Sequence, residues 1–166
     1  MSSSKRRRDP PDGVTALNRY VRTGIRSRQQ LRSYLRRSGV SSHQADQLIK
    51  TVEASGLVDD DAAAQLWAGH WARLGYAWAA IRLRLEARGF PAASIQRADQ
   101  RLGCSATDES RARELVIARR RRGASERARL ERALASRGFG PDLIEQILEE
   151  TESLDASRRA AGRAQV

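Results

Sequence analysis

Apolar residues recur along this chain at intervals of three and four positions, which is the spacing of one face of an α-helix. The clearest case is a phrase that occurs three times: LRSYLRRSGV at 31–40, IRLRLEARGF at 81–90 and LERALASRGF at 130–139. An apolar residue stands four and eight positions before each glycine, so these side chains stack on one helical face. The glycines, Gly39, Gly89 and Gly138, are 50 and 49 residues apart. The phrase predicts a helix that occurs three times and ends at a glycine each time.

Each copy of the phrase lies between two further amphipathic segments. The preceding segment ends near a second glycine, at Gly24, Gly75 or Gly123, and the following segment again has apolar residues at helical spacing. Trp67 and Trp71, four residues apart on the apolar face of one such segment, are expected to lie in the core. We therefore predict an all-α fold in which three tandem three-helix repeats form an elongated, curved array.

The predicted repeats span residues 14–58, 59–104 and 105–155, after a disordered basic leader at 1–13 and before a flexible tail at 156–166. Pro91 and Pro141 follow the glycines of the second and third repeats, where a proline can open a new helix. Ser41 and Ser42 are the expected caps at the equivalent place in the first repeat.

Three consecutive carboxylates stand in the stretch GLVDDDAAAQLW at 56–67, at the junction of the first and second repeats. A helix start has unsatisfied N–H groups and a partial positive charge, and Asp59, Asp60 and Asp61 can offset both. Consecutive side chains on a helix point about 100 degrees apart, so the three would not converge on a metal ion. Capping is therefore favoured, and a hydrolytic site built on this cluster is the minor alternative.

Other catalytic or metal-binding arrangements find little support. His43 and His70 have no nucleophile in a recognisable motif beside them, and the glycines are spaced as helix stops rather than as a phosphate-binding loop. The single cysteine, Cys104, excludes an internal disulfide and a multi-cysteine zinc site. No apolar run reaches the length of a membrane span. We expect a cytoplasmic, non-enzymatic protein without a cofactor.

The charge points to an anionic partner. Lys and Arg total 31 against 20 Asp and Glu, which gives a formal charge of +11, and all but Lys5 and Lys50 of the cations are arginines. Such a field attracts nucleic acid or an acidic protein surface, and arginine suits contacts with phosphate or carboxylate. The candidate binding residues are sixteen arginines on or near the middle helices: Arg22, Arg26, Arg28, Arg32, Arg36, Arg37, Arg82, Arg84, Arg88, Arg119, Arg120, Arg121, Arg122, Arg127, Arg129 and Arg132.

The chain resembles the RecX family, bacterial regulators of the RecA recombinase. The resemblance rests on the three-helix units, the junction ASGLVDDDAAAQLW at 54–67, the opening RSRQQLRSYL at 26–35 and the repeated RGF endings, and it covers about residues 14–155. The chain departs from the family pattern at Ala62 and Ala63, and at Ala77 and Trp78, where the family usually has Gly-Pro. These departures favour the first and third repeats as contact surfaces.

The resemblance implies a protein that binds in the groove of the RecA nucleoprotein filament. It would restrain ATP hydrolysis, strand exchange and coprotease activity, and so damp recombination and the SOS response. The alternative is a general DNA-binding protein that acts through its basic face on single- or double-stranded DNA. Such contacts would be phosphate-directed, weak and sensitive to salt. Repeats joined by short turns also allow a domain-swapped dimer.

Overall fold

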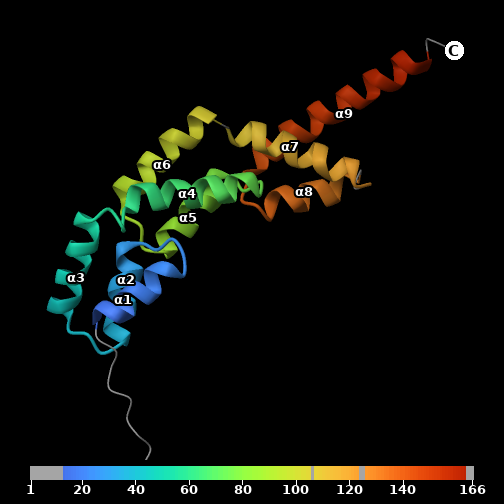
Figure 1. Cartoon of the computed structure of the whole chain (residues 1–166). Coiled ribbons are helices and arrows are strands. Elements are labelled where there is room, and N and C mark those ends of the chain that lie inside the picture. Colours follow the sequence, from blue (N-terminus) through green and yellow to red (C-terminus); the bar gives the residue numbers. More distant parts are fainter. Residues whose placement is uncertain (1–12, 106, 124–125, 164–166) are drawn as a thin grey trace, which may run out of the picture.

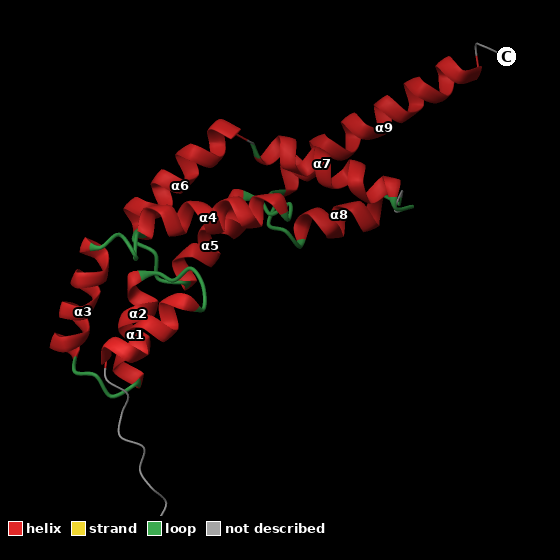
Figure 2. Cartoon of the chain, viewed as in Figure 1, coloured by secondary structure: helices red, strands yellow, loops and turns green. Residues whose placement is uncertain are grey.

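The structure is a computed structural model that describes residues 13–105, 107–123 and 126–163. The described residues form nine α-helices and no strand (Figure 2), as the sequence predicts. In chain order the helices are α1 (Gly13–Arg22), α2 (Arg28–Arg37), α3 (Ser42–Ala54), α4 (Asp60–Arg73), α5 (Trp78–Ala87), α6 (Ala92–Ser105), α7 (Asp108–Arg121), α8 (Arg127–Ala135) and α9 (Pro141–Arg163). The predicted leader lies outside the described residues apart from Gly13. Helix α9 continues through residues 156–163 of the predicted tail.

Three consecutive helices at a time enclose a hydrophobic core of their own. The first core lies among α1–α3, the second among α4–α6 and the third among α7–α9. Each core contains the apolar pair that precedes the helix-ending glycine, and these side chains are at most 1% exposed: Leu31 and Leu35, Ile81 and Leu85, Leu130 and Leu134. The helical face identified from the sequence is thus the face that is buried, and we call the three groups of helices the first, second and third units.

Side chains fix the starts of several helices. The Ser27 hydroxyl accepts the backbone N–H of Gln30, and the Gln30 side chain accepts the backbone N–H of Ser27, so α2 begins with a capping box. The Ser41 hydroxyl caps α3 as predicted, whereas Ser42 is the first residue of that helix. Pro91 directly precedes α6 and Pro141 opens α9, which are positions where proline's missing N–H costs nothing.

The glycines after the middle helices end them in the left-handed conformation. Gly39, Gly89 and Gly138 have φ angles of +88°, +74° and +82°, which L side chains rarely adopt. The last two also touch the preceding unit. A Cβ added at Gly89 would lie 2.2 Å from the Gln29 side chain, and one at Gly138 would lie 2.7 Å from the Cβ of Ala80. Glycine therefore both ends these helices and lets the next unit approach.

The units are joined through the ends of their middle helices. The Ser27 hydroxyl, at the start of α2, donates to the carbonyl of Arg88 at 2.5 Å, just after α5. One unit further on, the backbone N–H of Ala77, before α5, donates to the carbonyl of Arg137 at 3.0 Å, just after α8. The start of each middle helix thus meets the end of the next one. We call these two regions the first and second joints.

The array is an elongated arc (Figure 1). Helices α3, α6 and α9 follow its outer side, α5 and α8 lie toward its inner side, and α9 extends beyond the rest of the third unit (Figure 1). This arrangement confirms the predicted array of three-helix repeats, since each unit has its own core and successive units meet at the joints. None of the helices in the described ranges is long and apolar enough to cross a membrane.

Candidate binding interface

The three aspartates of the first junction bind three different elements. Asp59 caps α4, because its carboxylate accepts the N–H groups of Asp61 and Ala62 at 2.8 and 3.1 Å. Asp60 is buried, and its carboxylate accepts the N–H of Arg28 at 2.9 Å across the first joint. The predicted cap is confirmed for Asp59, while Asp60 links α4 to α2 instead.

Asp61 links α4 to α6. Its carboxylate accepts hydrogen bonds from the Ser94 hydroxyl at 2.5 Å and from the Arg97 guanidinium at 3.0 Å. These two hydrogen bonds lower the pKa of Asp61 below its usual value of 3.8, and the charge of Arg97 adds to the effect. In the part of the chain that the structure describes, no group of three or more His, Cys, Asp or Glu side chains could hold a metal ion. The hydrogen bonds of the three carboxylates cap α4 and connect it to α2 and α6.

The second joint repeats the link made by Asp60. Asp108, the first residue of α7, accepts the N–H of Trp78 at 2.8 Å, just as Asp60 accepts the N–H of Arg28. Trp78 and Arg28 are the first residues of their middle helices, where N–H groups lack intrahelical partners. Asp108 also pairs with the buried guanidinium of Arg111. Each new unit thus caps the middle helix of the unit before it.

Some predicted binding arginines are paired with carboxylates inside the protein. Arg28 pairs with Glu53 and lies 3.8 Å from Asp60, and Arg32 lies 2.7 Å from Asp46. The other pairs are Arg82 with Glu86 at 3.8 Å, Arg127 with Glu152 at 3.0 Å and Arg129 with Glu126 at 2.8 Å. Such arginines already have an anionic partner, so they contribute less to an unneutralised binding surface.

A different set of arginines lies at the first joint. The Arg88 guanidinium lies 4.4 Å from the centre of the Trp67 ring and 4.7 Å from that of Trp71. Arg26, in the α1–α2 turn, lies 4.8 Å from the centre of the Tyr20 ring. Stacking on an aromatic face holds a guanidinium in place without neutralising its charge. Trp71 is buried as predicted, but Trp67 is only partly buried and supports Arg88.

The second joint holds an equivalent pair of arginines. Arg84 and Arg137 lie 4.1 and 5.8 Å from the centre of the Tyr76 ring. The Arg137 side chain also donates to the carbonyl of Leu74 at 3.3 Å, which ties the end of α8 to the end of α4. We call Arg26, Arg84, Arg88 and Arg137 the joint arginines.

The joint arginines form an unneutralised row of charge. All four are partly buried, and none of them pairs with a carboxylate within the described residues. Burial lowers the pKa of Arg88, and the charges of Arg26 and Arg84 lower it further. The Nε atom of Arg26 is buried without a hydrogen-bond partner. Positive charges that are held close together and partly away from water repel one another, so binding of an anionic ligand is favourable.

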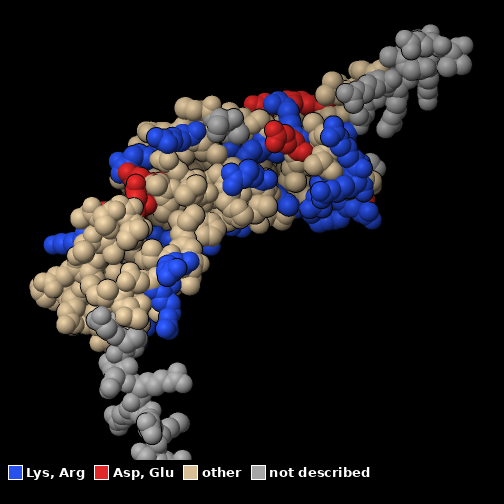
Figure 3. All heavy atoms as spheres, viewed as in Figure 1, with Lys and Arg blue, Asp and Glu red and all other residues tan. Residues whose placement is uncertain are grey.

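The remaining predicted arginines belong to the first and third units. Arg22, Arg36 and Arg37 are exposed in the first unit. The Arg120 side chain donates to the carbonyl of Thr151 at 3.4 Å. The others lie in the third unit: Arg119, Arg121 and Arg122 at the end of α7, and Arg132 in the last turn of α8. Figure 3 shows this end of the molecule as the most densely cationic part of the visible face.

Sequence reasoning missed one member of the row. Arg137 was not among the predicted binding residues, although Arg88 was, and the two precede the equivalent glycines Gly89 and Gly138 in the repeated RGF. The first unit has Ser38 at that position, and neither joint includes the end of α2. An arginine in the second and third copies but not in the first was therefore the signal of a residue at a joint.

Curated relatives and solved structures agree on one family. The chain is 33% identical over 155 residues to "Regulatory protein RecX" of Streptomyces coelicolor, and the match covers 86% of this chain and 81% of that protein. The same figures hold for the protein of that name from Streptomyces lividans. The crystal structure of RecX from Lactobacillus salivarius has a TM-score of 0.67 and 18% identity, and covers 84% of this chain and 94% of that one. No protein-family model matches the chain.

A second crystal structure, of a regulatory protein RecX, has a TM-score of 0.64 and 20% identity over 82% of this chain and 70% of that one. These structural likenesses establish the fold, and the identity to the two Streptomyces proteins establishes kinship over most of both chains. They agree with the resemblance found in the junction and in the RGF endings. The chain belongs to the RecX family, whose members are regulatory proteins rather than enzymes.

Proposed function

We propose that this protein binds the RecA nucleoprotein filament and inhibits its ATP hydrolysis, strand exchange and coprotease activities, and so modulates recombination and the SOS response. Membership of the RecX family supports this proposal. The observation that carries it is the row of joint arginines, which offers positive charge at both joints of the array. Positive charge contributed by all three units suits a partner that is itself a repeating, anionic assembly.

The row also suggests how binding would be selective. Stacking on Tyr20, Trp67 and Tyr76 fixes the guanidinium groups before a partner arrives, so little side-chain freedom is lost on binding. Arginines that are already ion-paired, such as Arg82 and Arg129, would have to break those pairs first. The joint arginines are therefore the first side chains that we would expect a filament to contact.

The test is the DNA-dependent ATPase of RecA, measured as this protein is added. We expect inhibition by the wild type and a loss of about tenfold in potency when Arg84 and Arg88 are both changed to Gln. The matched control changes Arg82 and Arg129 to Gln, which removes the same charge from exposed, ion-paired positions. An ATPase rate that stays unchanged at saturating wild-type protein refutes the proposal. Equal losses in the two double variants would remove the joint arginines from it.

A general DNA-binding function is the second candidate, and the arginines gathered at the end of α7 favour it. Arg121 and Arg122 are exposed there, as is Arg132 in the last turn of α8, and none of the three pairs with a carboxylate among the described residues. This function predicts that bare single-stranded DNA binds this protein as strongly as the RecA filament does. It also predicts that both interactions disappear together as the salt concentration rises. A preference for the filament that persists in moderate salt rejects it.

A further inference from the structure

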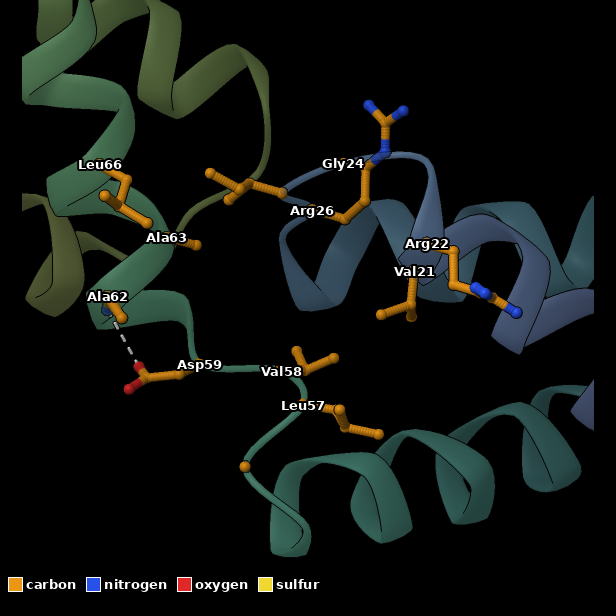
Figure 4. A pocket seen from close by; sticks show the side chains of 12 residues that line it. Val21, Arg22, Gly24, Arg26, Leu57, Val58, Asp59, Ala62, Ala63 and Leu66 are labelled. Carbon is orange, nitrogen blue, oxygen red and sulfur yellow. Dashed lines mark hydrogen bonds between the residues drawn. The ribbon is translucent and has the colours of Figure 1, made fainter.

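A groove of about 340 Å³ lies between the α1–α2 turn, the α3–α4 link and α4 (Figure 4). Three large apolar side chains line it although they are exposed to solvent: Ile25 is 41% exposed, Leu57 62% and Leu66 58%. The chain places these residues on three different segments, and the fold brings them together. Exposed leucine and isoleucine side chains that converge on one hollow are typical of a docking surface.

Positive charge flanks this apolar surface. The side chains of Arg22 and Arg26 line the groove, and Figure 4 shows their guanidinium groups pointing away from its centre, at the rim. Neither arginine pairs with a carboxylate among the described residues. Asp59 also lines the groove, but its carboxylate is occupied by the N–H groups at the start of α4. The groove therefore combines an apolar centre with an unneutralised cationic rim.

Hydrogen bonds and a stacking contact hold the walls of the groove in place. The indole N–H of Trp67 donates to the carbonyl of Ile25 at 3.4 Å, which ties the α1–α2 turn to α4. Arg26 stacks on Tyr20, and the Asp59 cap fixes the first turn of α4. A groove whose walls are fixed before binding loses little conformational freedom when a ligand enters.

We propose that this groove binds an acidic peptide segment that carries a large aliphatic side chain. The aliphatic side chain would contact Ile25, Leu57 and Leu66, and carboxylates on either side of it would meet Arg22 and Arg26. The inference deepens the proposed function and rests on it in one respect, since the segment would belong to RecA. A second copy of this chain is a poor occupant because its net charge is +11. A nucleic acid would use the rim but gain little from the leucines.

The direct test needs no RecA. A short fluorescein-labelled peptide of Asp, Glu and Gly with one central Leu is added to the full chain, and its fluorescence anisotropy is measured. We expect binding that weakens about tenfold when the peptide Leu becomes Ala, or when Leu66 of the protein becomes Asp. Leu83→Asp is the matched control, because Leu83 is 60% exposed on α5, does not line the groove and gains the same charge. Circular dichroism confirms that both variants fold.

Three results of the peptide assay overturn the inference. One is the absence of binding by the wild type, and another is equal weakening by Leu66→Asp and Leu83→Asp. The third is displacement of the peptide by oligothymidine, combined with equal binding of the peptides that carry Leu and Ala. That result would make the groove a phosphate-binding site. Weakening by Arg22→Gln with a shallower salt dependence supports the proposed role of the rim.

The RecA ATPase then separates this inference from the proposed function. Inhibition by the wild type that Leu57→Asp and Leu66→Asp weaken, and Leu83→Asp does not, supports both. Inhibition that all three variants retain in full leaves the proposed function standing and overturns the inference. If the wild type fails to inhibit, the proposed function fails, and the peptide assay alone decides whether the groove takes an acidic segment.

Discussion

Replacing Gly138 by Ala tests how the units are joined. Gly138 follows α8 with a φ of +82°, and an added Cβ would lie 2.7 Å from the Cβ of Ala80 and 3.5 and 3.6 Å from its backbone N and Cα atoms. Gly123 has nearly the same φ, +85°, but no atom lies within 4 Å of its added Cβ. The two substitutions therefore strain the backbone alike, and only Gly138→Ala also pushes the third unit away from α5.

The size of the effect follows from these two contributions. An alanine in the left-handed conformation costs about 1 to 2 kcal/mol of folding free energy. Forcing an extra methyl group into a packed contact typically costs about 1 to 3 kcal/mol more, and the opposing atoms of Ala80 are not the end of a flexible side chain that could turn away. We expect Gly138→Ala to lower the free energy of unfolding by about 2 to 5 kcal/mol, against about 1 to 2 kcal/mol for Gly123→Ala.

Urea unfolding followed by circular dichroism measures both losses. Adding Ala80→Gly to Gly138→Ala removes the opposing methyl group, so the double variant should recover part of the stability. By itself Ala80→Gly should cost about 1 kcal/mol, since it puts glycine inside a helix. Equal destabilisation by Gly138→Ala and Gly123→Ala would refute this description of the joint. A double variant whose loss of stability equals the sum of the losses in Gly138→Ala and Ala80→Gly would refute it too.

Three further variants test other contacts. Ser27→Ala removes a cap and the hydrogen bond to the Arg88 carbonyl, and should lower the free energy of unfolding by about 1 to 3 kcal/mol in a urea titration; an unchanged midpoint contradicts it. Asp108→Ala leaves the Trp78 N–H without its acceptor and should lower the free energy of unfolding by about 2 to 4 kcal/mol in the same titration. A loss below about 0.5 kcal/mol, which is usual for a surface substitution, would contradict the role of Asp108 at the second joint. Because the pKa of Asp61 is lowered in the folded state, the ionised carboxylate stabilises the fold above pH 3.8, and this stabilisation is lost as the pH falls through the lowered pKa. Asp61→Asn should therefore make the free energy of unfolding depend less on pH in the acid range. An equally steep dependence in the variant would exclude the link to α6.

Much of the fold follows from local patterns in the sequence. The pairs that end in Leu35, Leu85 and Leu134 identify the buried face because helical periodicity is a local property. Glycine stops and the Asp59 cap are local too, since they satisfy backbone groups within one turn of the chain. The family resemblance rests on the same short motifs, so the sequence alone is enough to identify it.

The candidate site was less accessible to sequence reasoning. Arg28 and Arg32 are among the binding residues predicted from the sequence, but α3 and α4 supply Glu53, Asp46 and Asp60 as their partners. Arg137 is not among those predicted residues, and only the packing at the second joint places it over Tyr76. Which arginines stay unneutralised depends on which acids lie across a tertiary contact, and no local pattern encodes that.

The helices, their threefold repetition and the excess of positive charge can therefore be predicted without a structure, because periodicity, caps and composition are properties of a few neighbouring residues or of the whole composition. The environment of each charge depends instead on how the units pack. The packing pairs Arg28 and Arg32 with acids, stacks the joint arginines on aromatic rings and gathers Ile25, Leu57 and Leu66 around one groove. The physical reason is that neutralisation and burial depend on distances between segments far apart in the chain, and only the packed units fix those distances.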